Sequence, residues 1–135
     1  ALSCQNLDAE NNRLSNLRDQ LEEGLSSIED TTINARNTDR LPTTLNISVE
    51  SVDGQQLLAA LSRNLAVSNG SACNSAATNP SHVLTAMGIG RNLALSTLRI
   101  SLGKYTTEKD IQQAILIITK EVAKQRASNL LWDRR

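Results

Sequence analysis

Cys73 lies near the middle of a stretch of small and polar residues, 69–81. Nothing in this stretch could anchor it to an apolar core, so we expect residues 69–81 to form a mobile surface loop. With a rise of about 3.3 Å per extended residue, such a loop would let the sulfur move over roughly 10 to 20 Å. A thiol on a mobile arm favours nucleophilic chemistry, and an inert surface cysteine is the alternative.

Arg99 lies in a segment, 97–103, that alternates apolar and polar residues and is therefore predicted to be a strand. The alternation puts Arg99 on the polar face. A guanidinium held on a rigid strand is suited to bind a carboxylate through two parallel hydrogen bonds, and a surface ion pair is the alternative. Asn46 and Ser48 share the polar face of an earlier predicted strand, 43–50, and either hydrogen-bond around the same cleft or are only hydrated.

The single histidine, His82, cannot form a histidine-based metal cluster. We expect it to cap or pack, with a role as acid or base for Cys73 as the less favoured alternative. Two cysteines, Cys4 and Cys73, fit no zinc spacing, and a disulfide between them is not favoured.

The composition excludes several classes of function. Fourteen basic residues balance fourteen acidic ones, so no global field draws the chain to nucleic acid or to an anionic bilayer. One Trp, one Tyr and no Phe leave little for stacking against bases. No apolar run approaches the roughly 20 residues that span a membrane. We therefore expect a soluble, cytoplasmic protein.

The elements around these residues indicate one domain, 1–135, of the α/β class, in which helices cover a small sheet. A helix is predicted over 8–24 and an edge strand over 31–34. Asp53 is the expected N-cap of a second helix, which a brief strand at 65–67 follows. Asn79 is the expected N-cap of a short helix that Gly88 ends. Thr107 and Asp110 form the pattern of a capping box, before a helix that runs to about Arg126.

Three segments together resemble the C-terminal part of class I, NifS/IscS-like cysteine desulfurases, a branch of the fold type I pyridoxal-phosphate enzymes. They are Val-Ser-Asn-Gly-Ser-Ala-Cys-Asn-Ser at 67–75, Pro-Ser-His-Val-Leu at 80–84 and Leu-Arg-Ile-Ser-Leu-Gly at 98–103. Further matches follow in the expected order, at 45–48, 106–108 and 130–132. The resemblance implies a mainly antiparallel sheet, as in the small domain of that fold.

The resemblance also implies roles for individual residues. Cys73 would be the nucleophile that takes sulfur from L-cysteine as a persulfide, leaving L-alanine, and Arg99 would bind the substrate carboxylate. From its place on the polar strand face, we also expect Asn46 to bind the substrate. The sulfur would pass to iron-sulfur cluster assembly or tRNA thiolation. The tail, 128–135, would help to dock a scaffold protein, with Trp132 as an anchor, unless it packs on its own domain. The full-length enzyme would be a homodimer.

The family's cofactor lysine lies in a Ser-x-His-Lys motif, and this sequence has none. Its lysines are Lys104, Lys109, Lys120 and Lys124. We therefore expect pyridoxal phosphate in the full-length enzyme, none on this chain, and no activity from the chain alone. Because the chain begins with Ala1 and not Met, we expect it to be part of a longer enzyme. A free-standing binding module and a small persulfide carrier are the alternatives.

Overall fold

The computed structural model describes residues 2–69 and 79–129, with side chains from residue 4 onward. Its helices are α1 (Leu2–Ser26), α2 (Gly54–Leu61), α3 (His82–Ala86), α4 (Arg91–Leu95) and α5 (Glu108–Ala127). Its strands are β1 (Thr31–Ile33), β2 (Thr44–Val49), β3 (Val67–Asn69) and β4 (Thr97–Ser101).

The strands form one sheet in the order β1-β2-β4-β3, and every neighbouring pair is antiparallel. This confirms the expected α/β fold with a small antiparallel sheet. The central strands are β2 and β4. Their register pairs Asn46 with Arg99 and Leu45 with Ile100, so polar residues of both strands share one face and apolar residues share the other.

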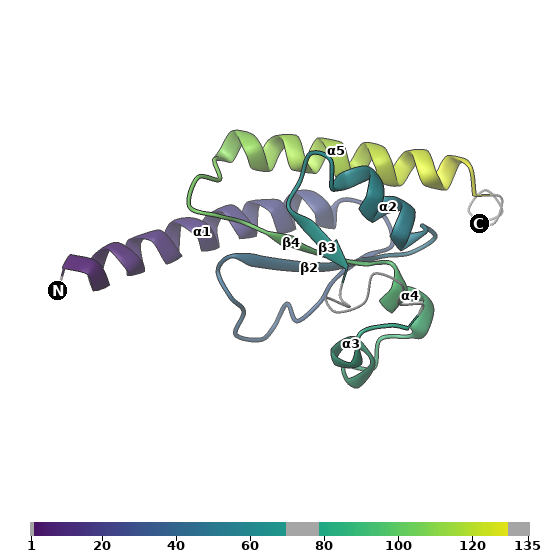
Figure 1. Cartoon of the computed structure of the whole chain (residues 1–135), viewed down its shortest axis with the longest axis horizontal. Helices are drawn as coiled ribbons and strands as arrows, with labels where there is room; N and C mark the ends of the chain where they lie inside the picture. The colour runs from purple at the N-terminus through teal and green to yellow at the C-terminus, as the bar shows by residue number, and fades with distance from the viewer. Residues whose placement is uncertain (1, 70–78, 130–135) are drawn as a thin grey trace.

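The apolar face of the sheet builds the core. Leu45, Ile47 and Leu98 are fully buried, in a cluster with residues of α1, α2 and α5. Full burial of one such side chain contributes about 1.5 to 3 kcal/mol. In Figure 1 these three helices lie on one side of the strands, whereas α3 and α4 lie on the other. The first turns of α1 extend beyond the sheet (Figure 1).

The predicted helix caps are confirmed at two of three places. The Asp53 carboxylate accepts hydrogen bonds from the backbone N–H groups of the first turn of α2, and Thr107 and Asp110 form a complete capping box on α5. The prediction for α3 was wrong, because its N-cap is Ser81 and not Asn79. Ser81 keeps an extended ψ of 134°, so Pro80 precedes the helix instead of opening it. Gly88 ends that region with φ +79°, as expected.

Two other boundaries differ from the sequence-based expectation. The brief strand expected at 65–67 is β3, two residues later, because its partner fixes its ends: Val67 pairs with Ile100 and Asn69 with Leu98. Helix α4 was not predicted, since a five-residue helix offers too little periodicity to detect. Within the part of the chain that the structure describes, no helix is both long and apolar enough to cross a bilayer.

Candidate functional site

Arg99 lies at the middle of β4, between Asn46 of β2 and Ser68 of β3. Its neighbours in sequence, Leu98 and Ile100, are buried in the core on the opposite face. Arg99 itself is half-buried on the polar face, as predicted. The strand backbone on both sides holds the base of the side chain in place, so the guanidinium starts from a rigid support.

The Arg99 guanidinium has no hydrogen bond or ion pair with any residue that the structure describes. Most other described arginines are engaged, and the exception, Arg63, is exposed to solvent. Arg13 and Arg18 reach carboxylates and backbone carbonyls, and Arg126 donates to the carbonyl of Glu50 at 2.9 and 3.2 Å. A guanidinium carries five N–H donors in a fork that matches a carboxylate. Arg99 therefore has its donors available for an anionic ligand.

A chain of hydrogen bonds crosses the polar face beside Arg99. Asn34 Nδ2 donates to Asn46 Oδ1 at 2.6 Å and to Ser48 Oγ at 2.8 Å. The hydroxyls of Ser48 and Thr97 lie 2.6 Å apart, and Thr97 Oγ1 donates to the carbonyl of Leu93 at 3.0 Å. These hydrogen bonds thus connect the end of β1, both central strands and α4.

Asn46 and Ser48, predicted to share a face, do share the same partner. The alternative in which they are only hydrated is wrong for Ser48, which has no exposed surface. Sequence reasoning missed Asn34. A local signal was present, because Asn34 directly follows the edge strand β1 and precedes Ala35, whose φ of 56° turns the backbone sharply. Its contact with β2 depends on strand register, which the sequence alone does not give.

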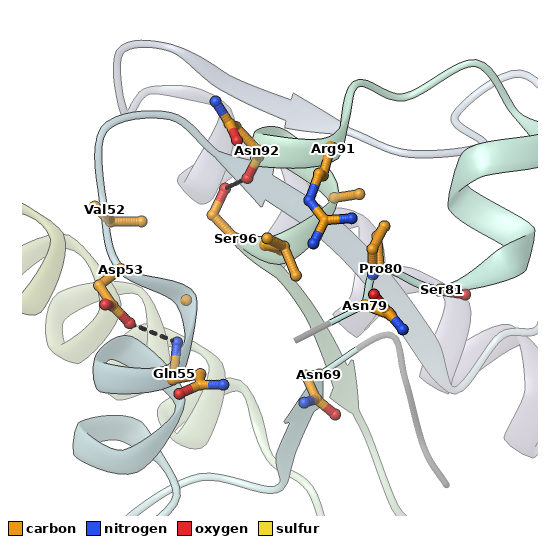
Figure 2. A pocket seen from close by; sticks show the side chains of 13 residues that line it. Val52, Asp53, Gln55, Asn69, Asn79, Pro80, Ser81, Arg91, Asn92 and Ser96 are labelled. Atoms are coloured by element: carbon orange, nitrogen blue, oxygen red, sulfur yellow. Dashed lines mark hydrogen bonds between the residues drawn. The ribbon is translucent and has the colours of Figure 1, made fainter. Parts of the chain in front are cut away.

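A pocket of about 490 Å³ lies on the molecule where β3 ends and α3 is about to begin (Figure 2). Asn69 and Asn79 both line it, together with Arg91, Asn92 and Ser96. Figure 2 shows these polar side chains gathered around it from separate segments of the chain. The described residues on either side of 70–78 therefore line the same pocket. Arg99 does not line this pocket.

The wall of the pocket formed by α2 is tightly built. Asp53 Oδ1 accepts from the N–H groups of Gln55 and Gln56, both at 2.9 Å, as Figure 2 shows for Gln55. Gly54 packs against the end of α4, where a Cβ would overlap the carbonyl oxygen of Leu95 and lie 2.8 Å from Ser96 Cα. Only glycine allows this approach, which fixes α2 against α4.

Two predicted site residues, Cys73 and Trp132, lie outside the described residues. Their expected roles, as the sulfur acceptor and as an interface anchor, therefore stay predictions.

His82 and Cys4 have exposed side chains. The expectation that His82 caps or packs was wrong, because Ser81 is the N-cap residue of α3 and Leu84 is its buried residue. The four lysines are also exposed, on α5 and on the loop before it. A cofactor lysine must lie in an enclosed site, so these lysines do not fit pyridoxal phosphate. In the described ranges no group of three or more His, Cys, Asp or Glu could hold a metal.

Residues 2–114 match the family model for aminotransferase class-V. The chain belongs to the aminotransferase class-V family. Within that family its relatives include cysteine desulfurase IscS of Shewanella denitrificans, 42% identical over 133 residues, and of Pasteurella multocida, 48% identical over 121 residues. The alignments cover 98% and 90% of this chain but only 33% and 30% of those proteins. The chain therefore spans about a third of the length of these aminotransferase class-V relatives.

Solved structures of NifS-like proteins are also similar to this chain. A NifS-like protein from Rickettsia africae superposes with a TM-score of 0.75 at 31% identity, covering 92% of this chain and 32% of that one. A second NifS-like protein gives 0.72 at 28% identity. These findings confirm the resemblance to NifS/IscS-like cysteine desulfurases that the sequence motifs indicated.

Proposed function

We propose that this chain is the C-terminal part of a cysteine desulfurase, in which Arg99 binds the carboxylate of L-cysteine and Cys73 takes up its sulfur as a persulfide. The single observation that carries the proposal is the Arg99 guanidinium, which is half-buried on a rigid strand and has no acceptor among the described residues. The similarity to cysteine desulfurases from two genera supports the same assignment.

The polar face suits an amino acid carboxylate better than a larger anion. The cross-strand neighbours of Arg99 are Asn46 and Ser68, both short and uncharged. A bidentate pair with the guanidinium would satisfy both carboxylate oxygens. The carboxylate would then fix one end of the substrate, and Cys73, which follows the last residue of β3 by four positions in the sequence, would attack its sulfur.

Breaking the carbon-sulfur bond of cysteine needs an electron sink, which pyridoxal phosphate supplies in such enzymes. The exposed lysines of this chain do not fit that group, so in this proposal another part of the full-length enzyme holds it. The residues of this chain orient the substrate and receive its sulfur. The chain alone is then inactive.

The persulfide on Cys73 would pass to an acceptor protein, for iron-sulfur cluster assembly or tRNA thiolation. The tail, 128–135, with Trp132 would contact that acceptor, because a tryptophan in a short tail is suited to anchor an interface. The enzyme would be a cytoplasmic homodimer, and the segment 69–81 would carry Cys73 between substrate and acceptor.

The test is steady-state kinetics of the full-length gene product with L-cysteine. Arg99→Lys keeps the charge but loses the two parallel hydrogen bonds, so the KM for L-cysteine should rise roughly tenfold or more. Arg63→Lys is the matched control, because Arg63 is an exposed arginine that follows α2. If Arg99→Lys leaves KM unchanged, Arg99 does not bind the carboxylate, and a persulfide carrier without a substrate site becomes the better hypothesis.

A further inference from the structure

The hydrogen-bond chain on the polar face has a fixed direction, because one end of it is a backbone carbonyl. Thr97 Oγ1 lies 3.0 Å from the oxygen of Leu93, which can only accept. If the Thr97 proton pointed elsewhere, two acceptor oxygens would face each other at that distance and repel. The single hydroxyl proton of Thr97 is therefore donated to the Leu93 carbonyl of α4.

The direction of the Thr97 hydrogen bond fixes the direction of the other hydrogen bonds on the polar face. Thr97 has no second proton, so the hydroxyl of Ser48, 2.6 Å away, must donate to it. Ser48 has then used its own proton and can only accept from Asn34 at 2.8 Å. The group of Asn34 that faces Ser48 must be its NH₂. Both hydroxyls are fully buried or nearly so, and no solvent competes for their protons.

The second proton of the Asn34 NH₂ group points at Asn46, 2.6 Å away. The Asn46 side chain must accept this proton with its Oδ1 atom, so the NH₂ group of Asn46 is directed away from Asn34. That NH₂ group makes no hydrogen bond to the described residues. The neighbour of Asn46 on the other side is Arg99, its pairing partner on β4.

We propose that Asn34, Ser48 and Thr97 form a directional relay that holds Asn46 as a hydrogen-bond donor beside Arg99, so that the two side chains bind one carboxylate together. This deepens the proposed function and rests on it. An amide can present either an acceptor or a donor, and an oxygen turned toward the ligand would repel a carboxylate. The relay removes that ambiguity. Asn46 is the binding residue, and the other three are positioning residues.

The relay predicts an effect from residues that do not touch the ligand. Thr97→Val keeps the side-chain shape but leaves Ser48 without its acceptor, so the proton order is lost and the Asn46 amide can turn over. The KM for L-cysteine in the full-length gene product should rise about tenfold, as expected for one lost hydrogen bond to a charged group, with little change in kcat. Thr97→Ser keeps the hydroxyl, so its KM for L-cysteine should stay close to the wild-type value.

A double-mutant cycle separates a relay from a general packing defect. If Thr97 acts through Asn46, then Thr97→Val should raise KM no further when Asn46→Ala is already present. An equal rise in both backgrounds would overturn the proposal, as would an unchanged KM in the Thr97→Val single variant. Arg99→Lys is measured in parallel. A rise in KM there without any effect of Thr97→Val refutes the relay alone, whereas no effect of Arg99→Lys refutes the carboxylate site itself.

Asn34→Asp provides a second variant in case Thr97→Val does not fold. Its carboxylate has no proton to donate, so the Asn46 NH₂ group should turn toward it and present the oxygen beside Arg99. The KM for L-cysteine should rise at least as much as in Thr97→Val, while thermal unfolding shows that the variant is folded. A folded Asn34→Asp enzyme with an unchanged KM would contradict the relay.

Discussion

Two ionic side chains, Arg99 and Glu22, show how differently this chain uses charge at the residue scale. Glu22 on α1 is buried, and its carboxylate meets Arg36 at 2.8 Å and Arg40 at 2.7 Å. Both arginines belong to the segment between β1 and β2, so Glu22 ties that segment to α1. Arg99 has no such partner among the described residues. The paired charge of Glu22 holds two segments together, whereas the half-buried Arg99 is left for the proposed ligand.

Glu22→Gln should destabilise the fold because it removes the charge that pairs both arginines. Hydrogen bonds to charged groups contribute about 1.5 to 3 kcal/mol each, so we expect a loss of about 2 kcal/mol in the free energy of unfolding, measured with urea. Glu23→Gln is the matched control, because Glu23 is the exposed neighbour on the same helix. Equal stability losses in the two variants would mean that the buried ion pairs contribute nothing specific.

The sequence predicts some site residues better than others, for a physical reason. Arg99 and Asn46 each sit in a strand that alternates visibly, and alternation alone assigns them to the polar face. Asn34 and Thr97 act through partners that strand register and a short helix bring to them. Such contacts join segments distant in the sequence, so no local pattern reveals them.

At the scale of elements, the first turn of α5 is held by a capping box. Thr107 N–H and Thr107 Oγ1 both donate to Asp110 Oδ2 at 2.8 Å, and the Asp110 N–H donates to Thr107 Oγ1 at 3.2 Å. These bonds, the backbone one first, lower the pKa of Asp110 from its usual 3.8. The ionised carboxylate is therefore favoured in the folded state.

Asp110→Asn should lower stability in a pH-dependent way. A carboxyl with a lowered pKa in the folded state stabilises above its unfolded pKa, and this contribution disappears as the pH falls through the folded pKa. The stability difference between wild type and Asp110→Asn should be largest near neutral pH and shrink below about pH 4. Urea unfolding across that range measures it. Asp39→Asn, at an exposed position, is the control. A difference independent of pH would contradict the capping role of the charge.

The close contact between α2 and α4 should make the stability of the fold sensitive to any side chain added at Gly54. Gly54→Ala brings a Cβ against the backbone of Leu95 and Ser96, which cannot move aside as a side chain could. We expect a loss of about 1 to 3 kcal/mol in the free energy of unfolding, as for other overpacked sites. Gly103→Ala is the control, since a Cβ there meets nothing within 4 Å. A Gly54→Ala protein as stable as Gly103→Ala would show that α2 and α4 adjust freely.

The long helices could be predicted from the sequence, whereas the short helices and strands could be predicted only in part. Helices α1 and α5 carry apolar stripes over many turns, and their caps or breakers are local signals. Helix α4 has five residues and β3 has three, so packing and pairing decide where they begin and end. Helix α4 matters for the site, because its Leu93 carbonyl gives the relay its direction.

At the scale of the whole molecule, the proposed function gives this chain the residues that bind the substrate and receive its sulfur, and gives the cofactor to another part of the enzyme. It spans about a third of its desulfurase relatives, and its lysines are all exposed. Given L-cysteine and pyridoxal phosphate, the 135-residue chain should release no alanine above the level of the cofactor alone. Amino acid analysis of the mixture measures this. Alanine formation that depends on the chain would contradict the division of roles proposed above.

The central claim is that Cys73 accepts sulfur from L-cysteine, and mass spectrometry of the full-length gene product tests it most directly. After incubation with L-cysteine and alkylation, the peptide with Cys73 should carry one additional sulfur atom, and Cys73→Ser should abolish that signal. Cys4, an exposed thiol on α1, is an internal control and should remain unmodified. Sulfur on Cys4 alone, or none on Cys73 while alanine is released, would contradict the account.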